Sequence, residues 1–222
     1  MRKTQFANGE GYHIFNRGAD KREIFLEARD YDRFLLAADL LNDQEDGLMI
    51  GWRNYKNANP KSALVDFLKP GFRKREPLVE IIAYCLNPNH YHFILKQIAD
   101  KGIERFMHKM GTSHTKYFNK KKKRTGTLFQ GRFKSAHIDS NEYLLYLSAY
   151  VNKNNFIHGY NKNDSWPYSS LADYLGKRKD KLVKKETVLG QFKDINEYEI
   201  FLRDKSLYMK DKKEMERYLL EE

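Results

Sequence analysis

The sequence predicts an α+β protein, because one segment has the pattern of a β-hairpin and three others have the pattern of amphipathic helices. In residues 81–95, two apolar, β-prone runs flank the turn-forming cluster Asn87-Pro88-Asn89. Apolar side chains recur at spacings of three and four in the other segments. These predict helices over residues 29–42, 102–119 and 142 to about 155.

The remaining elements follow in chain order. Residues 12–18 read as a first strand that ends at Gly18, and residues 48–55 as another strand. Residues 57–77 hold three of the five prolines, so we expect an insertion or long loop there, with one helical turn over 63–68. A glycine-punctuated loop over 126–138 leads into a further strand, and Asn141 is a plausible N-cap for the helix that follows. From Trp166 to Glu222 the chain reads as a helical C-terminal extension.

The helix over 142–155 carries two neighbouring stripes. Leu144, Leu147, Ser148 and Val151 form one, which we expect to face inward. The second stripe has a tyrosine at three positions and an amide at its end, namely Tyr143, Tyr146, Tyr150 and Asn154. An aromatic stripe of this kind is usually part of a core, but a hydroxyl and an amide one turn apart also suit a polar cleft.

Charge is concentrated in one part of the chain. The formal net charge is +11, which indicates a polyanionic partner. Residues 101–137 contain eleven Lys and Arg residues and one acid, Glu104, interleaved with Tyr117, Phe118, Phe129 and Phe133. A charge run is usually a solvated surface. Here we favour nucleic acid, since cations neutralise phosphates and exposed aromatic rings can stack on unpaired bases.

The composition also limits the class of protein. No apolar run is long enough to span a bilayer, and the N-terminus lacks the apolar core of a signal peptide. The single cysteine, Cys85, lies in an apolar strand and has no partner for an internal disulfide, so we expect a buried thiol and a cytoplasmic protein.

The hairpin contains the pair His90 and His92. Alternate residues of a strand share a face, so both imidazoles project together and Tyr91 points the other way. Two adjacent imidazoles can hold one metal ion, although a pair on a half-exposed sheet face could equally be solvated. His13, on the first strand, could be a further ligand, but a position near the surface fits it better.

Four segments together resemble the HUH-type single-tyrosine transposases, and most closely their REP-associated branch. These segments are Phe15-Asn16-Arg17-Gly18, Asn87-Pro88-Asn89-His90-Tyr91-His92, Gly126-Thr127-Leu128-Phe129-Gln130-Gly131-Arg132-Phe133 and Tyr150-Val151-Asn152-Lys153-Asn154. The resemblance covers roughly residues 6–160. It implies an antiparallel sheet of ferredoxin-like or RRM-like topology with helices on one face. Residues 1–165 would be the catalytic domain, with an insertion at about 44–78, and residues 166–222 the helical extension.

The resemblance also implies a chemistry and its residues. His90, His92 and Asn154 would be ligands of a divalent metal, Mg²⁺ or Mn²⁺, and Tyr150 the nucleophile that cleaves single-stranded DNA. Tyr146, one turn earlier, is the rival nucleophile. Binding of single-stranded or hairpin DNA is expected at Lys116, Lys120, Lys121, Lys122, Lys123, Arg124, Gln130, Arg132 and Lys134, with Arg132 the strongest candidate.

Alternatives remain open at this point. The family pattern has a proline after the ligand asparagine, whereas this chain has Asn155. A non-catalytic single-stranded nucleic-acid-binding protein on the same fold is therefore the main alternative. A replication initiator or relaxase of the wider HUH group is a third possibility, although those usually carry further domains. We expect a monomer, with a dimer that exchanges the tyrosine helix as the other option.

Overall fold

The computed structural model describes residues 5–69, 74–160, 166–178 and 181–219, and it centres on a four-stranded antiparallel sheet. The strands lie in the order β2-β3-β1-β4. Their bounds are Gly11–Arg17 for β1, Val79–Asn87 for β2, His90–Gln97 for β3 and Lys134–His137 for β4. The predicted hairpin is confirmed, since β2 and β3 pair in antiparallel register around a turn at Pro88 and Asn89.

The connections between the strands define the topology. Helix α1 (Ala28–Leu40) lies between β1 and β2, and α4 (Gly102–Lys121) lies between β3 and β4. A strand–helix–strand unit followed by a hairpin and a second helix, with the first strand placed between the third and the fourth, is the ferredoxin-like arrangement. The predicted fold class, α+β on an antiparallel sheet of this topology, is confirmed.

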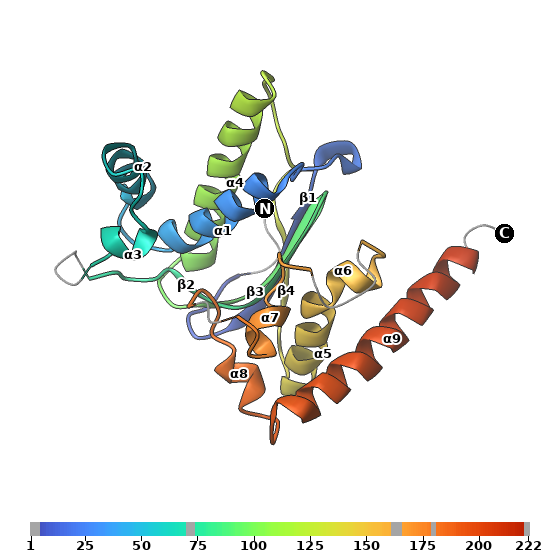
Figure 1. The fold of residues 1–222 in the computed structure, drawn as a ribbon. Coiled ribbons are helices and arrows are strands. Elements are labelled where there is room, and N and C mark those ends of the chain that lie inside the picture. The colour runs from blue at the N-terminus through green and yellow to red at the C-terminus, as the bar shows by residue number, and fades with distance from the viewer. Residues whose placement is uncertain (1–4, 70–73, 161–165, 179–180, 220–222) are drawn as a thin grey trace.

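Helices cover both faces of the sheet (Figure 1), and not one face as the resemblance implied. Helices α1 and α4 pack on one face, where the ring of Tyr91 meets Phe34 of α1 with centroids 5.5 Å apart. Helix α5 (Asn141–Asn152) contacts β2 and β3 on the opposite face, the one from which the histidines project. The histidine face is therefore covered by the tyrosine-bearing helix.

Residues 48–55 are helical, so the predicted strand is wrong. They belong to α2 (Leu48–Ala58), and α3 (Leu64–Phe67) follows close to the predicted turn. The apolar run at the start of α2 resembles a strand, but helical spacing brings Trp52 and Tyr55 onto one side, with ring centroids 6.2 Å apart. Phe67 of α3 packs against both rings, which gives the pair an apolar partner outside the sheet.

Helix α5 is shorter than predicted and begins with a different cap. The hydroxyl of Ser140, and not Asn141, accepts a hydrogen bond from the backbone N–H of Tyr143. The helix ends at Asn152, and a short helix α6 (Asn154–Ile157) follows after Lys153. The backbone N–H of Asn155 hydrogen-bonds the Cys85 thiol. A proline at position 155 would have no such N–H group.

Residues 166–178 and 181–184 contain several backbone groups that bond the outer edge of β2. The backbone N–H of Leu86 donates to the carbonyl of Tyr168 (2.8 Å), and Ser170 N–H donates to the carbonyl of Tyr84 (2.9 Å). Further along, Lys184 N–H donates to the carbonyl of Ile81 (2.8 Å). The described part of the C-terminal extension therefore packs on the sheet and satisfies backbone groups of an edge strand.

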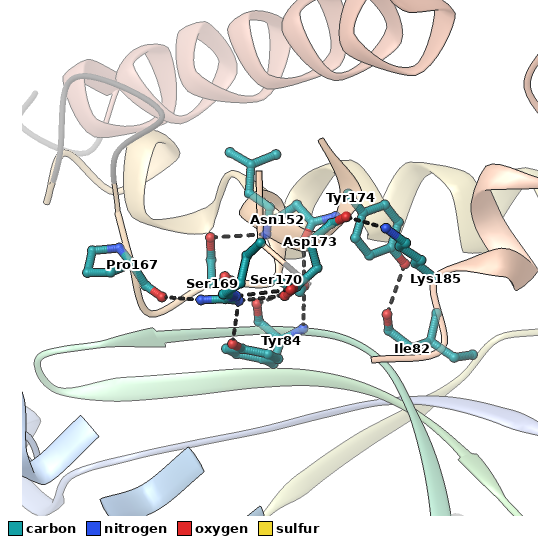
Figure 2. Close-up of polar contacts among 11 residues, drawn as sticks. Ile82, Tyr84, Asn152, Pro167, Ser169, Ser170, Asp173, Tyr174 and Lys185 are labelled. Carbon is teal, nitrogen blue, oxygen red and sulfur yellow. Dashed lines mark hydrogen bonds and ion pairs between the residues drawn. The ribbon is translucent and has the colours of Figure 1, made fainter. Parts of the chain in front are cut away.

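Side chains reinforce this attachment (Figure 2). Ser170 Oγ accepts from the backbone N–H of Tyr84 (2.9 Å) and donates to Asn152 Oδ1 of α5 (2.5 Å). The hydroxyl of Tyr174, in α7 (Leu171–Tyr174), donates to the carbonyl of Ile82. Asn152 also donates to the hydroxyl of Tyr198, which is fully buried.

Tyr198 belongs to α9 (Ile195–Leu219), which follows α8 (Glu186–Leu189) and packs on α5 and α6 (Figure 1). Within the described ranges, no helix is both long enough and apolar enough to cross a membrane.

Candidate active site

His90 and His92 lie on the sheet face that α5 covers. The register of the hairpin places His90 opposite Asn87 and His92 opposite Cys85, with His90 opposite Arg17 and His92 opposite Phe15 on the other side. The two imidazole rings are 5.2 Å apart, centroid to centroid. The predicted alternation is confirmed, because the ring of Tyr91 is buried on the opposite face.

The hairpin turn fixes the orientation of His90. Asn89 Oδ1 accepts a hydrogen bond from the hydroxyl of Tyr160 (3.0 Å) and lies 2.6 Å from His90 Nδ1. Because this oxygen only accepts, Nδ1 carries the proton and Nε2 of the neutral ring carries the lone pair. A histidine ligand commonly donates its second N–H to an amide or carbonyl oxygen in this way.

His90 Nε2 faces the side chain of Asn154. Asn154 Oδ1 lies 3.1 Å from Nε2, and the amide of Asn87 donates to both atoms, at 2.6 Å to the oxygen and 3.0 Å to the nitrogen. Two acceptor atoms thus point toward one position. Adjacent ligands of an octahedral Mg²⁺ at about 2.1 Å lie about 3 Å apart, which matches this separation.

His92 is held from the neighbouring strand. His13 Nε2 lies 2.8 Å from His92 Nδ1, so the expectation that His13 lies near the surface is wrong; its side chain is buried against the rings of His92 and Phe15. Burial lowers the pKa of His13 to about 4, and burial together with His13 and His90 lowers the pKa of His92 well below its usual value. Burial also lowers the pKa of His90. Neutral imidazoles are the form that binds metal.

Tyr150 reaches the same place from α5. Its ring meets the His92 ring edge-on with centroids 5.5 Å apart, and its hydroxyl lies 3.5 Å from His158 Nε2. Burial raises the pKa of the Tyr150 phenol, while the nearby amide of Asn154 opposes the increase. Tyr146, the rival, is 37% exposed.

The donor set can therefore be compared with what a metal requires. No cluster of three or more His, Cys, Asp or Glu side chains suited to a metal occurs among the described residues. The predicted set differs from such a cluster because its third member is the amide of Asn154. Two neutral imidazoles and an amide oxygen are ligands that Mn²⁺ accepts and that supply no negative charge. The residues present fit a divalent ion that receives its remaining ligands from phosphate or water.

The loop over residues 128–131 adjoins this site. Gln130 N–H donates to the carbonyl of Arg17, and Arg17 Nε donates to Gln130 Oε1 at 2.6 Å. Asn16 Nδ2 donates to the carbonyl of Gly131 (3.1 Å). Since Arg17 pairs with His90 in the sheet, this part of the basic segment lies beside the histidine end of the hairpin.

Most of the predicted nucleic-acid-binding side chains are exposed: Lys116, Lys120, Lys122, Lys123, Gln130, Arg132 and Lys134. Two are engaged within the protein. Lys121 Nζ contacts Asp30 Oδ1 (2.5 Å) and Glu27 Oε1 (2.7 Å) of the α1 region. Arg124 donates to Asn119 Oδ1 and to the carbonyl of Thr127.

The aromatic residues of this segment also differ from expectation. Phe118 and Phe129 belong to the hydrophobic core, and Tyr117 donates its hydroxyl to Asp30 at 2.6 Å. Phe133 packs in part against Phe6, with ring centroids 6.3 Å apart. The expected stacking platform is therefore wrong for Phe118 and Phe129, because Phe118 lies on the buried side of α4 and the ring of Phe129 packs against those of Tyr91 and His114.

Three neighbours of the site were not predicted. Asn87 and Asn89 were read only as turn formers, although both bond His90. His158 lies against His90, with ring centroids 5.2 Å apart, and nothing in its local sequence distinguishes it. Asn87 and Asn89 both lie at the tight turn over 88–89, so a search for polar side chains next to the histidine pair could have found them.

Comparison with known proteins agrees with this geometry. The family model described as "Transposase IS200 like" matches residues 71–154, a segment that contains His90, His92, Tyr150 and Asn154. A solved structure described as "Structure of the REP associates tyrosine transposase bound to a REP hairpin" has a TM-score of 0.51 and 14% sequence identity, and the match covers 83% of this chain and 96% of that one. No curated protein sequence matches the chain.

At 14% identity, the similarity to the solved structure shows the fold alone. The family model shows that the sequence of the hairpin and of the tyrosine helix is similar to that of IS200-like transposases. The resemblance to the single-tyrosine transposases is thereby confirmed: residues 71–154 match the IS200-like transposase family model, and the chain has a fold similar to that of a REP-associated tyrosine transposase.

Proposed function

We propose that this protein is a metal-dependent single-stranded DNA endonuclease and strand transferase that cleaves beside DNA hairpins through a covalent 5′-phosphotyrosine. One observation carries the proposal. Within a single chain, the Tyr150 ring lies 5.5 Å from that of His92, and the amide oxygen of Asn154 lies 3.1 Å from His90 Nε2. A nucleophile and a candidate cation site thus share one pocket of side chains.

Tyr150 would act as the nucleophile. Its phenolic oxygen forms a bond to the scissile phosphorus, the bond to the 3′ oxygen breaks, and that oxygen leaves as a 3′-hydroxyl after taking a proton. The phosphodiester is exchanged and not hydrolysed, so no nucleotide cofactor is needed. The usual phenol pKa of about 10 makes the tyrosine oxygen a moderate leaving group, which keeps rejoining to another 3′-hydroxyl feasible.

His90, His92 and Asn154 would hold the divalent ion, with Nε2 the donor atom of His90 and Oδ1 that of Asn154. When bound, a divalent cation supplies Lewis-acid polarisation of a phosphate oxygen. Two imidazoles are unusual ligands for Mg²⁺ and suit Mn²⁺ better, so we propose Mg²⁺ as the cellular ion, with tighter Mn²⁺ binding in solution. The burial of all three side chains keeps the imidazoles neutral and the amide fixed.

The DNA would approach from the side of the loop over 128–131. The REP-associated transposase of the solved structure is bound to a REP hairpin, and in this chain exposed cations flank the loop over 128–131 in the sequence. Backbone phosphates would be bound by Lys116, Lys120, Lys122, Lys123, Arg132 and Lys134, with Gln130 nearest to the site. Lys121 and Arg124 would contribute less, since acids or loop carbonyls already engage them.

The test is formation of a covalent protein–DNA adduct. Purified protein and labelled DNA hairpins with randomised single-stranded flanks are incubated with Mn²⁺ and separated on a denaturing gel. Tyr150→Phe should abolish the adduct, and Tyr146→Phe, the matched control on the same helix, should leave it. The opposite pattern would reassign the nucleophile. Hairpin binding with no adduct from the unaltered protein would favour the non-catalytic alternative.

A further inference from the structure

A lysine of the C-terminal helix is connected to Tyr150 through one histidine. Helix α9 packs along α5 and α6, as Figure 1 shows, and places Lys213 Nζ 2.5 Å from His158 Nδ1. His158 Nε2 lies in turn 3.5 Å from the hydroxyl of Tyr150. The three side chains therefore form a line from α9 to the proposed nucleophile, and Lys213 and His158 both lie outside the segment that the family model matches.

The chemistry of the three groups fixes the direction of the hydrogen bonds. An ammonium group has no lone pair, so Lys213 donates to His158 Nδ1, which must be unprotonated. The neutral imidazole then carries its proton on Nε2 and donates it toward the Tyr150 oxygen.

A donor aimed at the phenolic oxygen has two effects. It orients the oxygen, because the torsion of the hydroxyl is otherwise free. It also places a hydrogen-bond donor, backed by a positive charge, beside an atom that becomes negative when the phosphotyrosine bond breaks during rejoining. The distance of 3.5 Å is at the long end of the range, as is common for catalytic hydrogen bonds before substrate binds.

We propose that Lys213 and His158 are positioning residues for Tyr150, with Lys213 fixing the tautomer of His158 and His158 donating to the nucleophilic oxygen. This inference rests on the proposed function and extends it, since it makes the C-terminal helix part of the active site. A merely structural role for Lys213 would predict effects on stability and none on the cleavage step.

The first measurement needs no DNA. Long-range ¹H–¹⁵N NMR spectra of the intact chain report which imidazole nitrogen of His158 is protonated; assignment uses the loss of its signals in His158→Gln. We expect protonation at Nε2 at pH 7. Lys213→Met keeps the approximate length of the side chain but removes the donor, so it should change this tautomer. Lys212→Met, at an exposed neighbouring position, should not. Protonation at Nδ1 in the unaltered protein would overturn the proposal.

The second measurement is single-turnover cleavage of the hairpin pool, with DNA affinity determined separately. Lys213→Met and His158→Gln should slow adduct formation by about 10- to 100-fold, the usual effect of losing a charge-assisted or catalytic hydrogen bond, with little change in affinity. Lys213→Arg should restore most of the rate, and Lys212→Met should match the unaltered protein.

Two results would sink the role in cleavage: an unchanged rate in Lys213→Met, or a rate loss that follows a loss of affinity or folding. If the unaltered protein forms no adduct although His158 has the expected tautomer, the proposed function fails and with it the role in cleavage, while the hydrogen-bonded line stands. If the adduct forms and only the tautomer is wrong, the positioning proposal fails alone.

Discussion

Lys121 lies in a run of four lysines, yet the structure predicts that it stabilises the fold and does not bind DNA. Its ammonium group contacts Asp30 Oδ1 at 2.5 Å and Glu27 Oε1 at 2.7 Å, and the Asp30 side chain is fully buried. Lys122, the next residue, is exposed. Lys121→Met and Lys122→Met therefore form a matched pair: each removes one positive charge from the run, but only the first leaves a buried carboxylate without its cation.

The size of the effect follows from what remains around Asp30. Removing one partner of a buried ion pair costs about 3 to 5 kcal/mol when the other charge is left uncompensated. Asp30 keeps the hydroxyl of Tyr117 and the backbone N–H of Leu26 and Glu27, and 24% of the Lys121 side chain is exposed. We therefore expect Lys121→Met to lower the free energy of unfolding by about 2 to 3 kcal/mol. At 222 residues this corresponds to a fall in melting temperature of about 5 to 10 °C.

The assay pairs thermal unfolding with hairpin binding at several salt concentrations. Lys121→Met should have a lower melting temperature. At temperatures where this variant is folded, its affinity for the DNA hairpin should depend on salt almost as that of the unaltered protein does. Lys122→Met should have the melting temperature of the unaltered protein. Its slope of log affinity against log salt should be smaller in magnitude by about 0.7, the value for one lost single-strand phosphate contact. An unchanged melting temperature together with weaker DNA binding in Lys121→Met would refute the reasoning.

Three further predictions concern charge, metal and thiol. Hydrogen bonds from Lys121 and Tyr117 outweigh burial and lower the pKa of Asp30. The stabilisation by the Asp30 carboxylate is therefore present above the unfolded pKa of about 3.9 and is lost as pH falls through the lower folded pKa. In denaturation measured across pH, the free energy of unfolding of Asp30→Asn should converge on that of the unaltered protein in acid. Mn²⁺ should raise the melting temperature more than Mg²⁺, with the increase absent in His92→Ala; equal shifts would contradict the preference. Burial raises the pKa of Cys85 to about 12, so iodoacetamide should react with it only after unfolding; rapid labelling of native protein would show that the site opens.

The sequence predicted those parts of the fold whose signals are local. The hairpin was predictable because Asn87-Pro88-Asn89 has turn chemistry of its own, and Cys85 was correctly expected to be a buried thiol. The segment at 48–55 was misread because an apolar run gives no period, and its helix is stabilised by Phe67, from a later element. Charge counting failed at Lys121 for the same reason: its acids lie 91 and 94 residues earlier in the chain.

The candidate site was likewise predictable only where the signal in the sequence is local. The spacing of His90 and His92 implies a shared face, and the structure places the Tyr150 ring and Asn154 next to them. Their roles as nucleophile and ligands stay predictions. The contact of Lys213 with His158 joins residues 55 apart through the packing of a whole helix, and no sequence pattern announces it. The burial of His13 was equally out of reach, since it depends on α5 covering that face.

The backbone hydrogen bonds that Tyr168, Ser170 and Lys184 make with β2 have a practical consequence for anyone who shortens this chain. Truncation after residue 165 would strip the outer hydrogen-bonding row from β2 and expose a long apolar edge to other molecules. Such a fragment would be prone to associate through that edge and to precipitate. The segment that was predicted as a helical extension thus covers one edge of the four-stranded sheet, and we expect a shortened protein that lacks it to be poorly soluble.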